Sequence, residues 1–216
     1  MSNVSIEEAT KYFTQLLIDQ NNRISKISSN DEWIDFSNKK EIIIGICPGD
    51  GIGESISIQA KRILEDCLND EISSGKIIIK MIHGLTIENR IKHKQAIPDK
   101  ILAELKNCDV ILKGPTTTPQ KGDGNPNIES ANVAMRRELD LFACVRPIKV
   151  PKMGIDWTFF RENTEGAYML GSQGVDINDE FSVDFKVISN VGAKRIIQLA
   201  FEYAKKNKKK KVTVVT

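Results

Sequence analysis

The sequence predicts an α/β fold in which a parallel or mixed sheet is flanked by helices. Short apolar runs alternate along the chain with segments whose apolar residues recur at helical spacing. Turns rich in glycine and proline separate these segments, which is typical of parallel strands connected through helices. With 216 residues, of which 40% are hydrophobic, the chain is long enough for one sizeable domain or two small ones.

The first predicted element is a helical arm at residues 1–40. Ser5 and Glu8 form the pattern of a capping box, and apolar residues follow it at helical spacing. Residues 41–140 are expected to be the first part of a large α/β domain. Its predicted elements are a buried strand at 42–47, a turn at 48–53, a helix at 56–64, a strand at 76–81, a helix at 98–106 and a strand at 110–112.

Residues 141–216 are expected to form part of a smaller α/β domain. A turn-rich loop at 120–127 and a helix at 130–139 precede it. Its predicted elements are apolar stretches at 141–145 and 158–160, an alternating strand at 181–188, a helix at 192–205 and a last strand at 211–216.

Composition and charge narrow the classes of partner. A net charge of +2 is too small to indicate nucleic acid or an anionic membrane, and the basic run at 205–211 is better explained as the solvated end of a helix. The N-terminus lacks the pattern of a secretory signal, and no run approaches the roughly 20 apolar residues of a membrane span. The four cysteines are too widely spaced for a Cys-x-x-Cys motif. We therefore expect a cytoplasmic location, with neither nucleic acid nor a membrane as partner.

Two turns follow predicted strands and are candidates for ligand binding. The turn at 49–53 reads Gly-Asp-Gly-Ile-Gly, but a dinucleotide fingerprint would need glycine where Glu54 stands, so a tight turn is the simpler interpretation. The turn at 113–119 follows a strand end, where ligands bind in open α/β sheets. Its polar side chains include Lys113, Thr117 and Thr118. They could bind a ligand, or the threonines could simply stabilise a turn, and the residues leave both readings open.

The strongest candidate for a binding site is a group of polar and cationic residues. Ser130 and Asn132 begin the helix predicted at 130–139, and Arg136 shares a helix face with Asn132. Arg146 and Arg161 each end an apolar stretch. Converging guanidinium groups would suit a ligand with several carboxylates. Alternatively, each arginine pairs with a structural carboxylate, for which Glu138, Asp140, Glu162 and Glu165 are available.

Tyr168 follows Arg161 in the same stretch of sequence. A tyrosine next to a cluster of cations can act as a general acid, whereas a lone tyrosine is usually only a half-buried aromatic. The two histidines, His83 and His93, lie in different predicted elements without a third partner, so a catalytic or zinc-binding role is not expected of them.

Four motifs, taken together and in this order, resemble the isocitrate and isopropylmalate dehydrogenases, which are β-decarboxylating dehydrogenases. They are the turn at 49–53, the tripeptide Lys113-Gly114-Pro115, residues 130–147 and residues 160–166. The resemblance extends over about residues 41–216. It implies an isopropylmalate-dehydrogenase-like fold, and it favours the carboxylate-binding interpretation of the arginines.

The resemblance also implies roles for individual residues. Tyr168 matches the tyrosine that protonates the enolate after decarboxylation. Lys113, Thr117 and Thr118 match residues next to the nicotinamide ring. The positions that match the residues binding the substrate carboxylates are Ser130, Asn132, Arg136, Arg146 and Arg161.

The implied reaction is a metal-assisted oxidative decarboxylation with NAD or NADP as hydride acceptor. Hydride leaves C2 of a 2-hydroxy acid, and the resulting 2-oxo acid loses its β-carboxylate while Mg²⁺ or Mn²⁺ stabilises the enolate. Ser130 and Asn132 favour isocitrate, which would become 2-oxoglutarate, because they could hydrogen-bond its third carboxylate. Glu129, just before the serine, leaves 3-isopropylmalate or homoisocitrate open as the alternative.

Members of the family are usually much longer than this chain, and the connection between Arg146 and Arg161 is shorter than usual. The family's catalytic lysine, metal-binding aspartates and adenine-binding loops follow a strand like the one predicted at 211–216. We therefore expect a C-terminally truncated member, inactive by itself, with the metal ligands outside this chain. It could supply the substrate-binding half of an enzyme, either as a homo-oligomer or together with a complementing subunit. It could instead be a non-catalytic binding or regulatory subunit, or an inactive fragment.

Overall fold

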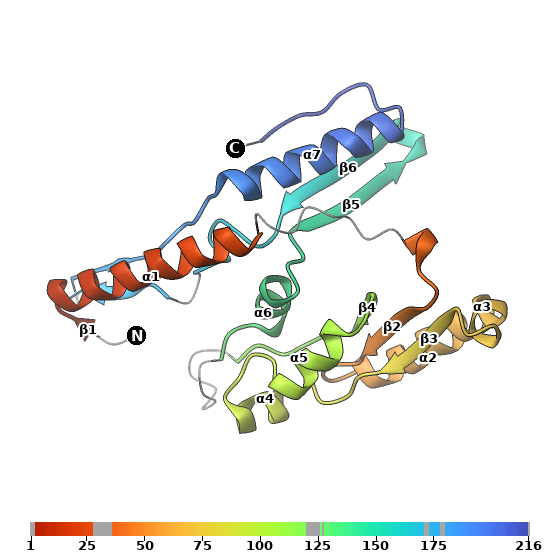
Figure 1. The fold of residues 1–216 in the computed structure, drawn as a ribbon, viewed down its shortest axis with the longest axis horizontal. Coiled ribbons are helices and arrows are strands. Elements are labelled where there is room, and N and C mark those ends of the chain that lie inside the picture. The colour runs from red at the N-terminus through yellow and green to blue at the C-terminus, as the bar shows by residue number, and fades with distance from the viewer. Residues whose placement is uncertain are drawn as a thin grey trace. The chain divides into compact units, whose positions relative to one another are not determined.

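The computed structural model describes residues 3–27, 36–119, 126, 128–170, 173–177 and 180–215. Its contacts divide the chain into two compact units, which we describe separately. Unit 1 consists of the described parts of residues 1–32 and 140–216, and unit 2 consists of those of residues 33–139. Figure 1 labels α1 to α7 and β1 to β6.

Unit 2 is built on a parallel sheet of three strands in the order β3-β2-β4. The central strand β2 (Ile42–Cys47) pairs in parallel with β3 (Ile77–Met81) on one side and with β4 (Val110–Lys113) on the other. These strands confirm the three that the apolar runs predict, and they confirm the α/β fold class. Parallel strands need crossover connections, and the helices between them serve as these connections.

The described helices of unit 2 are α2 (Gly53–Cys67), α3 (Asn69–Ser73), α4 (Ile87–His93), α5 (Asp99–Lys106) and α6 (Ala131–Glu138), with a 3-10 turn at Phe36–Asn38 before the first strand. The last two, α5 and α6, contribute buried residues to one core. The core joins Cys47 of β2 and Leu105 of α5 to Ala131 and Met135 of α6. Because α6 buries this face, its other face is left for polar residues.

Two glycines allow the loop after β2 and the loop after β4 to come into backbone contact. Gly49 has a φ of +77°, and a Cβ built on it would lie 2.0 Å from the carbonyl oxygen of Pro115. A Cβ on Gly114 would lie 2.0 Å from the carbonyl oxygen of Pro48. The Gly-rich turn is therefore a close-packing turn that holds the loop after β4.

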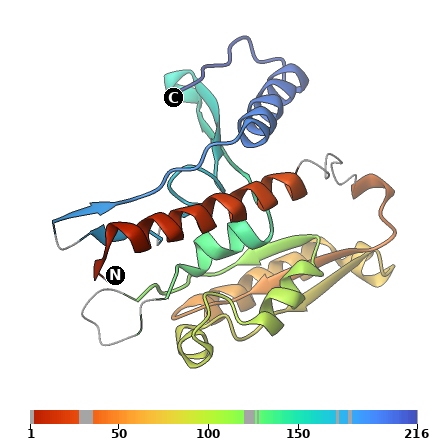
Figure 2. The same cartoon turned by 60° about the vertical axis from the view of Figure 1, so that its left-hand side comes forward.

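Unit 1 contains a long antiparallel hairpin with a helix on one face. Strands β5 (Ala143–Val150) and β6 (Ile155–Glu162) are joined by a 3-10 turn at Pro151–Met153. Helix α7 (Asn190–Lys206) lies along this hairpin (Figures 1 and 2). Tyr203 of α7 packs its ring 5.1 Å from that of Phe160, and its hydroxyl lies 3.2 Å from that of Thr158.

The rest of unit 1 is a small sheet with the N-terminal helix beside it. Strand β7 (Val175–Ile177) pairs in parallel with β1 (Asn3–Val4) and antiparallel with β8 (Phe181–Val183). Helix α1 (Ile6–Ile27) begins with the predicted capping box of Ser5 and Glu8. Its buried Leu16 packs in a core with Met169 and Leu170.

Two expected features differ in the structure. Of the strand predicted at 181–188 only β8 forms, because Phe185 and Val187 turn instead toward the core around Leu16. The strand predicted at 211–216 is absent from its described residues, 211–215, where the side chain of Val215 is 91% exposed. A strand needs a neighbour for its backbone hydrogen bonds, and this segment pairs with none among the described residues. Most of the loop predicted at 120–127 lies outside the described residues.

The division into an arm at 1–40 and domains at 41–140 and 141–216 stays a prediction. The contacts join the first helix to residues 140–215, and they place the boundary between units after Leu139. No helix of the described residues is both long and apolar enough to cross a membrane.

Replacing Gly49 by alanine should lower the free energy of unfolding by about 3 kcal/mol or more, because the new Cβ meets backbone that cannot move easily. Gly51 is the matched control, since it also has a positive φ but has nothing within 4 Å of a built Cβ. Gly51→Ala should cost only about 1–2 kcal/mol, the strain of the backbone itself. Urea unfolding of both variants measures the difference. Equal losses would show that the close approach of the two loops contributes nothing.

Candidate functional site

The loop after β4 is clamped from two directions by buried charged side chains. The carboxylate of Asp50 accepts hydrogen bonds from the backbone N–H groups of Thr117, at 2.6 Å, and Ile87, at 2.7 Å. The fully buried Arg90 donates to the carbonyl oxygens of Thr117, at 2.6 Å, and Glu129, at 2.9 Å. Thr117 is therefore fixed at both its N–H and its C=O group.

This clamp leaves the predicted cofactor-contacting hydroxyls available. The side chains of Thr117 and Thr118 are exposed, although the backbone that carries Thr117 is fixed. A hydroxyl on a fixed loop can hydrogen-bond a ligand without much loss of conformational entropy.

Lys113 links this loop to α6. Its Nζ donates to the carbonyl oxygen of Gly114 at 2.7 Å and lies 3.1 Å from the hydroxyl of Thr116. Thr116 lies 3.5 Å from the side-chain oxygen of Asn132. Burial lowers the pKa of Lys113, and the nearby Arg136 lowers it further. Within unit 2, the loop and the polar face of α6 therefore form one cationic neighbourhood.

The polar face of α6 presents the residues expected to bind carboxylates. Ala131, Ala134 and Met135 are buried in the core, while Asn132 is exposed and Arg136 is half-buried. These four-residue spacings put the polar pair on the side away from the core.

Ser130 and Glu129 stand at the start of α6. Ser130 occupies the N-cap position, but its hydroxyl makes no capping hydrogen bond to the helix. Glu129 is held by Arg137 in a two-pronged ion pair, at 2.7 and 3.0 Å, which also raises the pKa of Arg137. The negative charge of Glu129 is therefore already balanced by Arg137 within unit 2.

In unit 1, the register of the hairpin places two predicted arginines on one face. Arg146 stands opposite Phe159, and Arg161 stands opposite Cys144. Side chains alternate between faces along a strand, so both arginines lie on the face that α7 does not cover. Both are exposed.

Arg161 and Tyr168 contact each other directly. A guanidinium Nη2 of Arg161 hydrogen-bonds the hydroxyl of Tyr168, and its Cζ lies 5.2 Å from the centre of the tyrosine ring. The sequence interpretation linked these two residues through their closeness in the sequence and through their family roles. The structure gives the pair a geometry in which a cation sits beside a phenol.

The predicted site residues thus fall into two groups, one in each unit. Lys113, Thr117 and Thr118 lie with the start of α6 in unit 2, and Arg146, Arg161 and Tyr168 lie in unit 1. Each group is brought together within its own unit.

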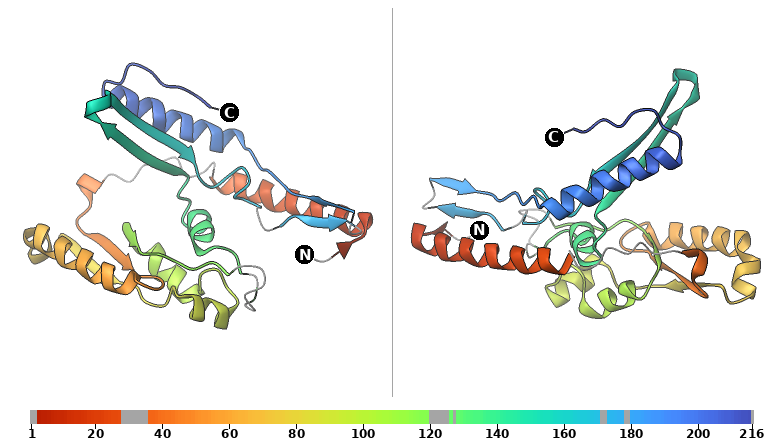
Figure 3. Two further views of the ribbon diagram at one scale, coloured as in Figure 1. Left: turned by 180° about the vertical axis from the view of Figure 1, so that it is seen from behind. Right: turned by 45° about the horizontal axis from the view of Figure 1, so that its top comes forward.

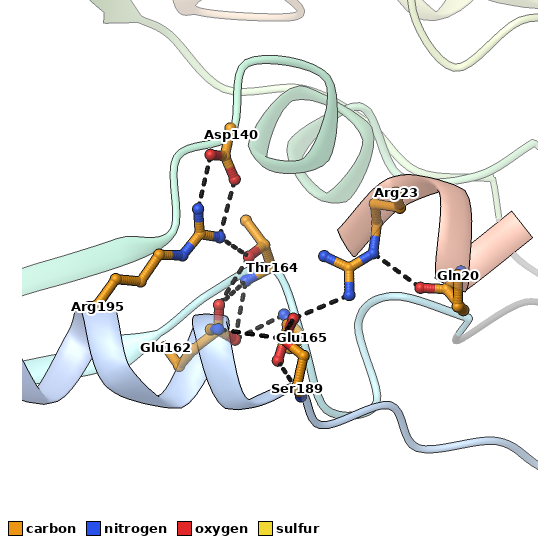
Figure 4. A network of polar contacts seen from close by, with 9 residues as sticks. Gln20, Arg23, Asp140, Glu162, Thr164, Glu165, Ser189 and Arg195 are labelled. Atoms are coloured by element: carbon orange, nitrogen blue, oxygen red, sulfur yellow. Dashed lines mark hydrogen bonds and ion pairs between the residues drawn. The ribbon is translucent and has the colours of Figure 1, made fainter. Parts of the chain in front are cut away.

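The carboxylates that could have neutralised the arginines have other partners. Glu138 pairs with Arg137, Asp140 with Arg195, Glu162 with the backbone and hydroxyl of Thr164, and Glu165 with Arg23 and Ser189. Figure 4 shows the last three, with Glu162 and Glu165 close together near the start of α7 and Asp140 at the guanidinium end of Arg195. Among the described contacts, these carboxylates therefore pair with groups other than Arg146 and Arg161.

Glu165 is the most deeply buried of these carboxylates. Its oxygens accept hydrogen bonds from the hydroxyl of Ser189 at 2.6 Å, from the N–H of Ser189 at 2.8 Å and from Nη2 of Arg23 at 2.8 Å. Burial raises the pKa of Glu165, but these bonds outweigh burial and the net pKa is lowered. Glu165 therefore stays ionised and connects α1 with the N-terminus of α7.

A metal site is not formed by the described residues. No group of three His, Cys, Asp or Glu side chains among them is arranged to hold an ion. The cysteines are not paired either: Cys47 is a buried free thiol, and burial raises its pKa to about 11.

Residues 43–216 match the family model described as isocitrate/isopropylmalate dehydrogenase. The chain belongs to the isocitrate/isopropylmalate dehydrogenase family. The solved isocitrate dehydrogenase of Methylococcus capsulatus superposes on 78% of this chain and 49% of its own, with a TM-score of 0.60 and 29% sequence identity. The motif resemblance and the fold class that it implied are therefore confirmed.

Among curated relatives, an isocitrate dehydrogenase [NADP] of Archaeoglobus fulgidus is 34% identical over 88% of this chain and 52% of its own length. One from Haloferax volcanii is 30% identical over 88% of this chain and 51% of its own length. The chain spans about half the length of the curated relatives it matches. The N-terminal helix α1 lies before the residues that match the family model.

Sequence reasoning missed the residues that support this dehydrogenase-family site. Asp50 was visible between two glycines, but nothing local shows that its carboxylate reaches Thr117. Arg90 and Arg23 sit in helices with no motif, and their partners are far away in the sequence. A buried charge in a helix is recognised only once its burial is known.

Glu165→Gln should lower the free energy of unfolding by roughly 2–4 kcal/mol near neutral pH, because it removes the charge that Arg23 and Ser189 stabilise. A lowered folded-state pKa means that the stabilisation is present above the ordinary value of 4.5 and is lost as pH falls through the lower, folded-state value. The difference between wild type and variant should therefore shrink in acid.

Urea unfolding of both proteins from pH 7 to pH 3 measures this difference. Glu7→Gln is the control, because Glu7 is an exposed carboxylate on α1 paired only with an exposed lysine. It should leave the curve close to that of the wild type. A gap for Glu165→Gln that stays constant down to pH 3 would contradict the assignment.

Proposed function

We propose that this chain supplies the substrate-binding half of an NADP-dependent dehydrogenase that oxidatively decarboxylates isocitrate to 2-oxoglutarate and CO2. The observation that carries the proposal is the contact of the Arg161 guanidinium with the hydroxyl and ring of Tyr168. A phenol beside a cation can protonate an enolate whose carboxylate the cation binds. The relatives named isocitrate dehydrogenase [NADP] support both the substrate and NADP in preference to NAD.

In this proposal the arginines bind the carboxylates of the substrate. The guanidinium groups of Arg146 and Arg161 face solvent on one side of the hairpin, where two-pronged hydrogen bonds to a carboxylate can form. Arg136 would act in the same way from α6, together with the amide of Asn132. Tyr168 then donates its proton to the enolate carbon, with Arg161 stabilising the phenolate that remains.

Lys113, Thr117 and Thr118 are proposed to lie beside the nicotinamide ring. Their loop fits this task because Asp50 and Arg90 fix its backbone while the two threonine side chains stay exposed. When bound, NADP accepts the hydride from C2 of the substrate. The Mg²⁺ or Mn²⁺ of this proposal would need ligands from outside the described residues, so no step of these side chains depends on it.

Isocitrate is favoured over 3-isopropylmalate or homoisocitrate by the start of α6. The hydroxyl of Ser130 is not used to cap the helix, and Asn132 is exposed, so both can hydrogen-bond a third carboxylate. An isopropyl group at this place would offer neither side chain a hydrogen bond, at a cost of roughly 1–3 kcal/mol for a polar group that loses its water. Glu129 is engaged by Arg137 and does not decide between the substrates.

Titration calorimetry of the 216-residue chain with isocitrate tests the proposal. Binding should be detectable, and Arg161→Ala or Arg136→Ala should weaken it at least about tenfold, since each removes a charged hydrogen-bonding partner. Arg62→Ala is the control, because Arg62 lies on α2 and, among the described residues, hydrogen-bonds Gln59 of its own helix. The control should bind like the wild type.

Two outcomes would contradict the proposal. No heat with isocitrate, 3-isopropylmalate or citrate would exclude a substrate-binding half. Tighter binding of 3-isopropylmalate than of isocitrate would overturn the assignment of substrate.

A non-catalytic binding or regulatory subunit is the alternative from another class. Both readings predict isocitrate binding and no NADPH formation by this chain alone, and both allow a homo-oligomer or a complementing subunit. They separate when a complementing chain is added. A catalytic half should lose NADPH formation on Tyr168→Phe, whereas a regulatory subunit should change only the substrate concentration that its partner requires.

A further inference from the structure

Helix α1 precedes the part of the chain that matches the family, yet it is built into unit 1. Strand β1, just before it, pairs with β7. Phe13 of α1 stacks on Phe185 with ring centres 5.4 Å apart, and Leu16 is buried against Met169 and Leu170. Figure 3 shows α1 alongside β7 and β8 from two directions. The helix is therefore part of the core of unit 1.

The contacts of α1 fall on both sides of Tyr168. Three residues before it, Glu165 accepts a hydrogen bond from Nη2 of Arg23 at 2.8 Å. Directly after it, Met169 and Leu170 are 4% and 5% exposed because they pack on Leu16. A short turn of chain that carries the tyrosine is thus held at both ends by the same helix.

Glu165 transmits the position of Arg23 to this turn. The N–H of Tyr168 lies 3.4 Å from the carbonyl oxygen of Glu165, which closes the turn. The side chain of Glu165 cannot shift freely, because Ser189 donates two hydrogen bonds to it and Gly192 leaves no room beyond: a Cβ there would lie 2.4 Å from a carboxylate oxygen.

Arg23 is itself oriented along its helix. Its Nε donates to the side-chain oxygen of Gln20 at 2.8 Å, which leaves Nη2 directed at Glu165, as Figure 4 shows. The side chain is 17% exposed, and its partner is 4% exposed. An ion pair this sheltered is weakly screened by salt, so it can hold its geometry.

We propose that Arg23 is a positioning residue, which acts through Glu165 to hold the turn that carries Tyr168 against Arg161. Helix α1 then has a function beyond stability, because it sets where the phenol points. The inference rests on the proposed function in that Tyr168 is taken as the proton donor, but the placement of the tyrosine can be measured without any turnover.

The experiment uses the full chain labelled with ¹³C at Cζ of tyrosine. Only three tyrosines occur, so the resonance of Tyr168 is identified by its loss in Tyr168→Phe. Arg23→Ala should shift this resonance and should speed hydrogen exchange of residues 163–170 roughly tenfold or more. Lys11→Ala is the matched control, because Lys11 lies on the same helix in an ion pair whose partners are 75% and 81% exposed. It should change neither signal.

A conservative variant separates positioning from general stability. Arg23→Lys keeps the charge beside Glu165 and should return the Tyr168 resonance toward its wild-type position. The proposal is overturned if Arg23→Ala leaves the resonance where Lys11→Ala leaves it. It is equally overturned if both Arg23 variants speed exchange uniformly through α7 and the hairpin, since Arg23 would then be merely structural.

Adding isocitrate to the wild type distinguishes this inference from the proposed function. A Tyr168 resonance that ignores isocitrate but moves in Arg23→Ala would reject the proton donor and retain the positioning role. If the resonance responds to isocitrate equally in wild type and Arg23→Ala, and hydrogen exchange is unchanged, the positioning role is rejected and Tyr168 is retained as the proton donor.

Discussion

The burial of one carboxylate, that of Glu165, organises unit 1. An ionised group inside a protein costs several kcal/mol in lost hydration unless charged and hydrogen-bonding partners replace the water. Ser189 and Arg23 are these partners, and they come from opposite ends of the unit in sequence. Satisfying a single charge therefore brings together α1, the turn before Tyr168 and the first residues of α7.

In unit 2, buried charges are compensated in a similar way around the loop that follows β4. Asp50 and Arg90 are buried, and each is compensated mainly by backbone groups. Both side chains bond to the backbone of Thr117. The hydrogen bonds that compensate their burial therefore also fix the loop at the carboxyl end of the sheet. The glycines at 49 and 114 make this possible, since any Cβ would force the two loops apart. In each unit, buried charges hold a backbone segment that carries a side chain predicted to meet a ligand.

Much of this site could be predicted from the sequence because its signals are local. The strands at 42–47 and 110–112 are apolar runs that residue type alone identifies, although Val110 and Leu112 are exposed in the structure. The face shared by Asn132 and Arg136 follows from helical spacing alone. The family resemblance rests on residue types in a fixed order, which the family model bears out. The prediction of a strand at 211–216 was wrong for its described residues, 211–215, although it rested on an equally local pattern. A strand depends on neighbouring strands, which a sequence pattern does not show.

The sequence by itself determined the fold class, the family and the residue types available for binding carboxylates, since periodicity and motif order are properties of one stretch of chain at a time. Only the tertiary structure decided which charges are buried and with whom they pair. In the structure, Arg161 contacts Tyr168. The ion pairs are Glu129 with Arg137, Asp140 with Arg195 and Glu165 with Arg23. The physical reason is that the energy of an ion pair depends on burial and distance, and Arg23 and Glu165 lie 142 positions apart in the sequence.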